Sequence, residues 1–192
     1  MKRYQSNRFA WLVAVACAIQ LAQAEVDFTP IESTRELDGI VFPITVFRDG
    51  VQKITYDPPR GWRLSGSGTK LTLVPQDIPN VDAQVEVNSL TAVLPINEAN
   101  VQKYVASAQQ TVPRGVKVVE VLGSTLNPLK ICGFDTLAVE IQYEAFGTTY
   151  RSQLLYLNRD RQQWTFRFTA PAATYVRAIE PFRVSLCTFQ GL

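Results

Sequence analysis

The stretch from residue 134 to residue 170 alternates apolar and polar side chains with a period of two. Its first run places five apolar residues on one face, namely Leu137, Val139, Ile141, Tyr143 and Ala145. Its last run repeats the pattern with Trp164, Phe166, Phe168 and Ala170. Successive side chains of a strand point to opposite faces, whereas a helix needs apolar residues at spacings of three and four. The alternation therefore predicts β-strands with one apolar face.

A third run, from Thr149 to Leu157, lies between these two. It ends in four consecutive apolar residues, Leu154 to Leu157, as expected of a strand that is covered on both faces. Gly147-Thr148 and residues 158–161 supply the turns, because Gly, Asn and Asp tolerate the backbone angles that reverse a chain. The three runs predict a meander whose central strand is 149–157 and whose apolar face needs a cover.

Two segments predict helices. Asn97 is a suitable N-cap, and apolar residues at spacings of three and four follow it, which predicts a helix from about Glu98 to Val112. A second helix is predicted from Ala170-Pro171 onward, where Pro181 should kink or restart it. Its apolar stripe consists of Tyr175, Ala178, Ile179, Phe182, Leu186 and Phe189.

The remaining segments complete one domain. Further strands are predicted at residues 40–47, 51–56, 71–74, 81–90 and 116–122. Pro43 lacks the amide that a strand ladder needs, so its strand should lie at a sheet edge. Residues 25–39 are polar and contain Pro30, which predicts a loosely ordered N-terminal arm. Residues 40–192 are then a single α+β domain, an antiparallel β-sheet packed by helices.

The first 24 residues have the three parts of a secretory signal peptide. A basic start precedes Phe9, an uncharged apolar segment follows, and Ala22-Gln23-Ala24 forms a small-x-small cleavage site. The apolar segment is too short and too rich in small residues for a typical membrane span, which takes about 20 mostly apolar residues. We expect export to the periplasm or the cell exterior, with a mature chain that begins at Glu25 and has no membrane span. An uncleaved anchor is the alternative.

The same segment has a second interpretation. Val13 to Cys17 resembles a bacterial lipobox, in which the Cys is lipidated and becomes the first residue of the mature protein. Ala14 stands where Leu is usual, and the apolar run continues past Cys17. Cleavage after Ala24 is therefore preferred, and an outer-membrane lipoprotein lipidated at Cys17 stays open as the alternative.

Signal removal changes the charge balance. Three of the 19 Lys and Arg residues and none of the 17 Asp and Glu residues precede Glu25, so 16 positive and 17 negative side chains remain and the net charge is near −1. Without a net positive field, there is no electrostatic argument for nucleic acid or anionic lipid as a partner. We expect a protein or small-molecule partner and no nucleic acid.

Cys132 and Cys187 remain after cleavage. An even pair of thiols in an oxidising compartment favours a disulfide bond over two separately buried thiols. We therefore predict a bridge between them, with two free thiols as the alternative.

The sequence offers little for catalysis or metal binding. It contains no histidine, which removes the most frequent general base, the Ser-His-Asp triad and His-based metal sites. Two Cys without His or clustered carboxylates do not make a zinc site. We expect no catalytic, metal-binding or cofactor-binding residue, and no enzymatic activity.

A hydrolase is the weaker alternative. Asp135, Glu140 and Glu144 could supply the carboxylate pair of a glycoside hydrolase. However, Glu140 and Glu144 alternate with neutral polar residues, which is typical of a solvated strand face. The segment from Gly61 to Lys70 lacks the terminal Gly-Lys-Ser/Thr of a phosphate-binding loop and predicts a flexible hairpin.

Two tryptophans could either pack or bind a ligand. Trp164 is in phase with Phe166 and Phe168, which favours core packing over ligand stacking. Trp62 follows Pro58-Pro59, and we interpret it as an aromatic anchor at the surface, next to a rigid corner.

The order of these elements resembles the PsbP-like superfamily. The segments that carry the resemblance are Tyr56-Asp57-Pro58-Pro59-Arg60-Gly61-Trp62, Gln163-Trp164-Thr165-Phe166 and Ser185-Leu186-Cys187-Thr188-Phe189. The superfamily includes the oxygen-evolving-complex protein PsbP, a eukaryotic Ran-binding import factor and exported bacterial proteins. The resemblance covers about residues 40–189, although Cys187-Thr188 stands where Ser is common and Pro181 interrupts the last helix.

The resemblance implies an α/β/α sandwich and a non-enzymatic binding or accessory role, but no particular partner, because fold does not fix function. We therefore expect an exported binding or accessory protein of the bacterial cell envelope that works through a sheet surface or its loops. A lipoprotein scaffold and a hydrolase are the alternatives.

Overall fold

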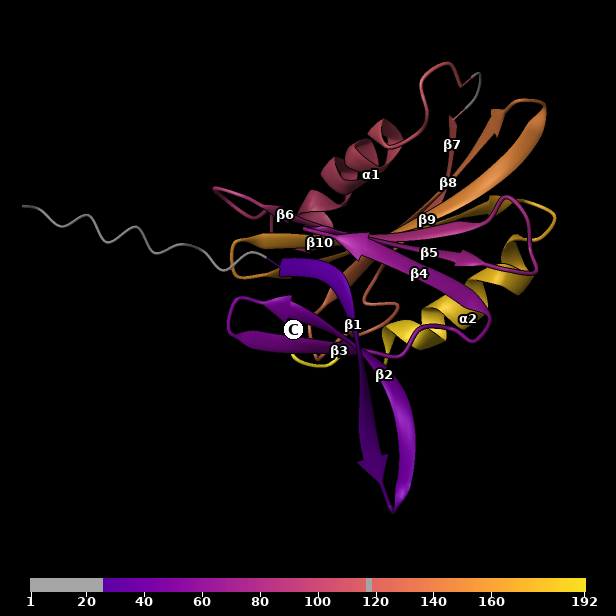
Figure 1. The fold of residues 1–192 in the computed structure, drawn as a ribbon. Coiled ribbons are helices and arrows are strands. Elements are labelled where there is room, and N and C mark those ends of the chain that lie inside the picture. Colours follow the sequence, from indigo (N-terminus) through magenta and orange to yellow (C-terminus); the bar gives the residue numbers. More distant parts are fainter. Residues whose placement is uncertain (1–25, 117–118) are drawn as a thin grey trace, which may run out of the picture.

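The computed structural model describes residues 26–116 and 119–192, which form two antiparallel sheets and two α-helices (Figure 1). The small sheet has the strand order β1-β2-β3 and the large sheet the order β4-β5-β6-β10-β9-β8-β7. The strands are β1 (Val26–Leu37), β2 (Ile40–Asp49), β3 (Gln52–Tyr56), β4 (Trp62–Ser67), β5 (Lys70–Pro75), β6 (Asp82–Ser89), β7 (Val119–Leu126), β8 (Thr136–Ala145), β9 (Thr148–Arg159) and β10 (Gln162–Pro171). The helices are α1 (Val101–Gln110), which follows a 3-10 helix at Glu98–Asn100, and α2 (Tyr175–Leu186).

Strands β8, β9 and β10 form the predicted meander. Strand β9 pairs antiparallel with both neighbours, and Leu157, for example, lies opposite Thr136 on one side and Trp164 on the other. Leu154 to Leu157 are all buried, as a strand covered on both faces requires. The prediction that β9 is the centre of the meander is confirmed, while β10 is the middle strand of the whole large sheet.

The two α-helices cover opposite faces of the large sheet (Figure 1). Helix α1 contributes Tyr104 and Ala108 to a core that also contains Leu137, Val139, Ile141, Leu154 and Tyr156. Helix α2 packs on the other face, together with the small sheet, and this second core holds most of the buried aromatic residues. The chain is therefore an α+β protein with the predicted sandwich of helices and sheet.

The apolar side of β10 is the centre of the second core. Trp164, Phe166 and Phe168 are 0%, 1% and 1% exposed. The ring of Phe168 lies 5.8 Å from that of Phe182 in α2, and the ring of Trp164 meets Phe28 of β1 edge-on at 5.6 Å. The predicted contact between this strand and the amphipathic C-terminal helix is confirmed.

The N-terminal segment differs from the prediction. We expected residues 25–39 to be irregular, but Val26–Leu37 form the 12-residue strand β1 and pair with β2. Only Val26 and Phe28 are buried, so most of the strand has no apolar side for sequence periodicity to reveal. The register shifts between Asp27 and Ile31, and this irregularity accommodates Pro30.

Two other boundaries have simple explanations. Helix α2 begins at Tyr175, later than predicted, because Pro171 still belongs to β10. Pro181 lies inside α2, and the buried residues Phe182 and Leu186 continue the apolar face beyond it. The prediction that the strand with Pro43 lies at a sheet edge is wrong, because β2 is the middle strand of the small sheet. Pro43 is tolerated there because β3 pairs only with Thr45–Asp49. Helix α1 lies where it was predicted, and the Asn97 Oδ1 accepts a hydrogen bond from the Asn100 amide at 3.2 Å.

The structure contradicts the predicted disulfide bond. Cys132 and Cys187 are both free and exposed. Cys132 lies in a turn with a left-handed backbone conformation, and its Sγ donates a hydrogen bond to the Phe189 carbonyl at 3.0 Å. Its thiol is therefore directed at the backbone of the C-terminal segment and not at Cys187.

The aromatic core generates a stability prediction. We expect Phe168→Ala to lower the free energy of unfolding by about 3–5 kcal/mol, because the cavity would lie between β10 and α2. Phe146→Ala is the matched control, because Phe146 is fully exposed and its loss should cost less than about 0.5 kcal/mol. Urea unfolding of both variants measures the difference, and similar losses would contradict the assigned core.

Candidate functional site

A two-stranded ribbon projects from the body of the protein (Figure 1). It is formed by residues 31–44 of β1 and β2, which we call the arm. Its turn is at Asp38-Gly39, where both residues have positive φ angles of 51° and 76°. Because β3 pairs only with Thr45–Asp49, the arm has no third strand in the described part of the chain.

One face of the arm is largely apolar. Residues directly opposite in an antiparallel pair share a face, and Leu37 lies opposite Ile40 while Arg35 lies opposite Phe42. Ile31, Phe42, Leu37 and Ile40 are 38%, 41%, 58% and 59% exposed. Large apolar side chains gathered on a projecting element, and left in water, mark an interaction surface.

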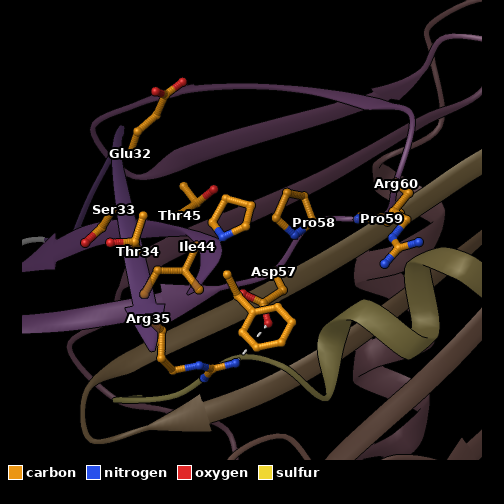
Figure 2. Close-up of a pocket in the computed structure, with 12 residues that line it drawn as sticks. Glu32, Ser33, Thr34, Arg35, Ile44, Thr45, Asp57, Pro58, Pro59 and Arg60 are labelled. Atoms are coloured by element: carbon orange, nitrogen blue, oxygen red, sulfur yellow. Dashed lines mark hydrogen bonds and ion pairs between the residues drawn. The ribbon is translucent and has the colours of Figure 1, made fainter. Parts of the chain in front are cut away.

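A groove of about 940 Å³ lies between the arm and the loop that follows β3 (Figure 2). We call it the arm groove. Its lining comes from three segments, namely 32–35, 42–45 and 57–60. Pro58 and Pro59 make the loop wall stiff, because each proline ring fixes a backbone φ angle.

The charges around the arm groove are mixed. The Arg35 Nη2 lies 3.5 Å from the Asp57 Oδ2, and both side chains are about 40% exposed. Such exposed pairs contribute about 0.2–1 kcal/mol. This ion pair therefore adds little to the attachment of the arm to the loop. Glu32 and Arg60 also line the groove, and the four side chains together carry no net charge.

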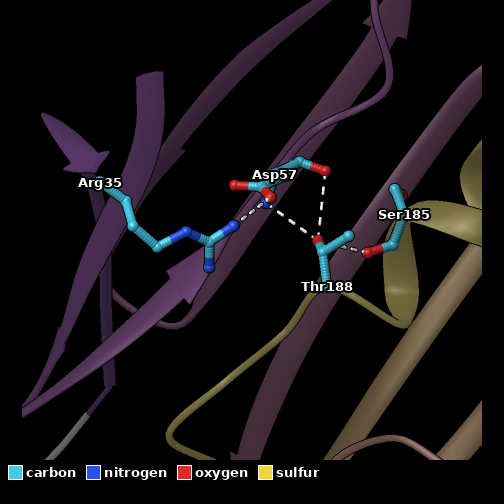
Figure 3. A network of polar contacts seen from close by, with 4 residues as sticks. All are labelled: Arg35, Asp57, Ser185 and Thr188. Carbon is cyan, nitrogen blue, oxygen red and sulfur yellow. Dashed lines mark hydrogen bonds and ion pairs between the residues drawn. The ribbon is translucent and has the colours of Figure 1, made fainter. Parts of the chain in front are cut away.

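The loop wall of the groove is fixed to the end of α2 (Figure 3). The Asp57 amide donates to the Thr188 Oγ1 at 3.0 Å, and the Thr188 Oγ1 donates to the Ser185 carbonyl at 2.7 Å. One residue earlier, the Tyr56 hydroxyl and the Ser185 Oγ are 2.8 Å apart in a buried hydrogen bond. The Tyr56 ring also stacks on Phe189 with centroids 4.3 Å apart. The groove therefore has a rigid wall on the core and an exposed wall on the arm.

Sequence reasoning did not find this site. Arg35, Phe42 and Asp57 carry no common motif, and they converge only because β1 pairs with β2 across the arm. Ser185 and Thr188 belonged to a segment that was noted only for its family resemblance. One signal could have indicated the arm. Asp38-Gly39 is a typical hairpin turn, and exposed apolar residues lie on both sides of it.

The two tryptophans singled out in the sequence both pack against other aromatic residues. Trp164 is fully buried in the core. Trp62 begins β4 and is partly buried, and its ring stacks on Phe182 of α2 with centroids 6.3 Å apart. It therefore attaches β4 to the helix beside the loop that forms the groove wall.

The carboxylates considered for a hydrolase do not converge. Glu140 and Glu144 lie four residues apart on β8, which separates them by about 13 Å along the strand. The expectation of a solvated face holds for Glu144, which is exposed. It fails for Glu140, whose side chain is only 30% exposed because Tyr175 at the beginning of α2 lies against it. Glu140 accepts hydrogen bonds from Arg151 at 2.8 Å, Gln153 at 3.0 Å and the Tyr175 hydroxyl at 3.3 Å.

Asp135 forms a separate surface ion pair with Lys130 at 3.2 Å. Within residues 26–116 and 119–192, no three His, Cys, Asp or Glu side chains are grouped so that they could hold a metal ion. Neither helix in this part of the chain is long and apolar enough to cross a membrane. Cys17 and the segment up to Glu25 lie outside the described residues.

Comparisons with known proteins identify the fold. No family model and no curated protein matches the chain. The solution structure of cyanobacterial PsbP (CyanoP) from Synechocystis sp. PCC 6803 matches with a TM-score of 0.54 at 9% identity, covering 90% of this chain and 96% of the other. The crystal structure of LpqN, involved in cell envelope biogenesis of Mycobacterium tuberculosis, matches with a TM-score of 0.50 at 12% identity, covering 84% and 90%. The chain therefore has a PsbP-like fold, and identities this low show the fold alone.

The Tyr56–Ser185 contact generates a pH-dependent prediction. Burial raises the pKa of Tyr56 well above 10, so the folded protein keeps this phenol neutral while the unfolded chain ionises it above about pH 10. Its contribution to stability is therefore complete below that pH and is lost as the pH rises. We expect Tyr56→Phe to cost about 1 kcal/mol at neutral pH and to make the alkaline loss of stability less steep.

Ser185→Ala is the matched control. It removes the same hydrogen bond but leaves the Tyr56 phenol buried, so it should lower stability at neutral pH without reducing the alkaline loss. Urea unfolding at neutral pH and above pH 10 distinguishes the two variants. Equal alkaline slopes for wild type and Tyr56→Phe would show that Tyr56 is not the titrating group.

Proposed function

We propose that this protein is an exported, non-enzymatic binding or accessory protein of the bacterial cell envelope. It holds an extended, apolar segment of a partner protein in the arm groove. The observation that carries the proposal is the exposed apolar face of the arm. One of its residues, Phe42, lines the groove together with the stiff loop that is fixed to the core.

The edge of the arm supports an extended occupant. Strand β1 is the end strand of the small sheet, so from Ile31 to Leu37 its outer backbone groups have no strand partner in the described part of the chain. An extended peptide can add to such an edge, with backbone hydrogen bonds for affinity and alternate side chains for specificity. Arg35 interrupts the apolar face, while Glu32 and Glu36 lie on the opposite face of the same strand. Charges on an edge strand prevent indiscriminate pairing.

Two observations support an envelope location. Strand β1 begins at Val26, so cleavage after Ala24 would leave the folded domain intact. One protein with the same fold, LpqN, is described as involved in cell envelope biogenesis.

Two features favour binding over catalysis. The whole chain contains no histidine, and the carboxylates of Glu140 and Glu144 are far apart.

The export step has a direct test. We expect the intact mass of the protein purified from its native cells to correspond to a chain that begins at Glu25. A mass that instead corresponds to a diacylglyceryl group on Cys17 would identify a lipoprotein and contradict cleavage after Ala24. A mass that retains residues 1–24 without lipid would contradict export by a cleavable signal.

The arm can be tested by site-specific photocrosslinking in intact cells. We expect a photoreactive amino acid at Ile40 to yield a discrete crosslinked product, because that side chain lies on the apolar face. Val51 is the control position, because it is fully exposed in the turn between β2 and β3, outside the arm.

A second substitution establishes that the arm itself selects the partner. We expect Phe42→Asp, introduced with the crosslinker at Ile40, to remove the product, whereas Val51→Asp should leave it. Both positions are exposed or largely so, and the stability of each variant should change by less than about 0.5 kcal/mol. Equal crosslinking at Ile40 and Val51, or none at Ile40, would overturn the proposed role of the arm.

A further inference from the structure

A polar cluster lies on the face of the large sheet that carries α1, beyond the end of that helix. Strand β6 contributes Asp82, and β10 contributes Arg167 and Thr169. Thr169 lies directly opposite Asp82 on one side and opposite Ser152 of β9 on the other. This cluster shares no residue with the arm groove.

The two charged residues of this cluster, Arg167 and Asp82, do not form a direct hydrogen bond. The Arg167 Nη2 is 3.9 Å from the Asp82 Oδ2, which is too far for a hydrogen bond. Asp82 accepts one hydrogen bond from Gln84 at 3.2 Å, whereas the Arg167 Nε is enclosed and has no hydrogen-bond partner within the described residues. A guanidinium donor that is enclosed without an acceptor is rare in a folded protein and calls for an explanation.

Two adjoining cavities open at this pair. The inner one has a volume of about 120 Å³. It is lined by strand residues and by residues 111–113, which follow α1; the strand residues are Asp82, Ile141, Tyr143, Ser152, Arg167 and Thr169. The outer one has a volume of about 440 Å³, which is within the range of small-ligand sites. The two share Asp82, Pro113, Tyr143 and Thr169.

The outer cavity is mainly apolar and aromatic. Its walls include Val74, Val81, Tyr143, Phe146 and Tyr150. The rings of Tyr143 and Tyr150, which both line this cavity, are stacked with centroids 5.7 Å apart. One end of the combined cavity therefore offers one positive and one negative group, and the other end offers an apolar wall.

We propose that this combined cavity binds a small zwitterion, an α-amino acid with an apolar or aromatic side chain. The carboxylate of the ligand binds the Arg167 guanidinium, and its ammonium group binds the Asp82 carboxylate. The side chain lies against Tyr143 and Tyr150. Such a ligand supplies an acceptor for the unpartnered guanidinium and adds no net charge to the partly buried pair.

Isothermal titration calorimetry of the full folded chain with three related probes tests the proposal. The probes are L-phenylalanine, phenethylamine, which lacks the carboxylate, and 3-phenylpropanoate, which lacks the ammonium group. We expect saturable binding of L-phenylalanine at concentrations up to millimolar. Each single-charge probe should bind at least about tenfold more weakly, because each loses one charge-assisted hydrogen bond.

Two substitutions assign the roles of the charged residues. Arg167→Gln and Asp82→Asn should each weaken L-phenylalanine binding by about tenfold or more. Arg167→Gln should also abolish the preference for L-phenylalanine over phenethylamine. Matched controls are Arg63→Gln and Glu86→Gln, because both residues are exposed and line neither cavity, and these variants should bind as the wild type does.

A further variant tests the apolar wall and does not touch the ion pair. Ala145 lines the outer cavity, so Ala145→Leu should weaken binding of L-phenylalanine while leaving that of glycine unchanged. Thermal unfolding of each variant shows whether it is folded before titration. No saturable binding of L-phenylalanine or glycine, or equal binding of all three aromatic probes, would overturn the proposal and leave Asp82 and Arg167 as a structural ion pair.

Discussion

The packing of alternate β10 side chains against α2 is the interaction on which the rest of the structure depends. Phe168 contacts Phe182 of the helix, while Trp164 contacts Phe28 of the small sheet. One strand therefore joins the helix and the second sheet into a single core. Phe28 in turn packs edge-on against Phe47 of β2, with ring centroids 5.2 Å apart. The same core therefore extends to β2. Burial of large aromatic rings supplies much of the energy of such a core, and each ring here contacts a different element.

The arm exists because this core ends before β1 does. Val26 and Phe28 are buried, whereas Ile31 and the residues that follow are exposed. Beyond that point the strand is held by its ladder with β2, and a two-stranded ribbon in water is marginal unless something else orders it. Here the ribbon is continuous with a packed base, because Val26 and Phe28 of the same strand are buried in the core. An ordered ribbon without a core is suited to binding, because its apolar side chains are already positioned and still uncovered.

The sequence predicted the elements whose burial is regular and missed those that depend on long-range pairing. The outer strands of the meander and α1 were recognised because their apolar residues follow a strand or helix period, and the central strand because it ends in a continuous apolar run. Strand β1 was missed because only its first residues face the core, and the arm groove was missed because its lining combines three separate segments. Glu140 was misassigned for a related reason. Its neighbours on β8 alternate as on an exposed strand, but α2, which follows two strands later, covers it.

Strand alternation also explains how the large sheet can carry an aromatic core on one face and a partly polar cavity on the other. Even-numbered residues of β10 from Trp164 to Ala170 enter the aromatic core on the α2 side, while Arg167 and Thr169 face the α1 side. Helix α1 is only ten residues long, so it covers about 15 Å of that face and leaves the ends of β6 and β10 open. Polar residues placed there do not disturb the core, because their neighbours along the strand provide the burial. We therefore expect a substitution at Arg167 to alter the cavity and leave the fold unchanged. A substitution at the next residue, Phe168, should instead destabilise the fold and leave the cavity lining unchanged.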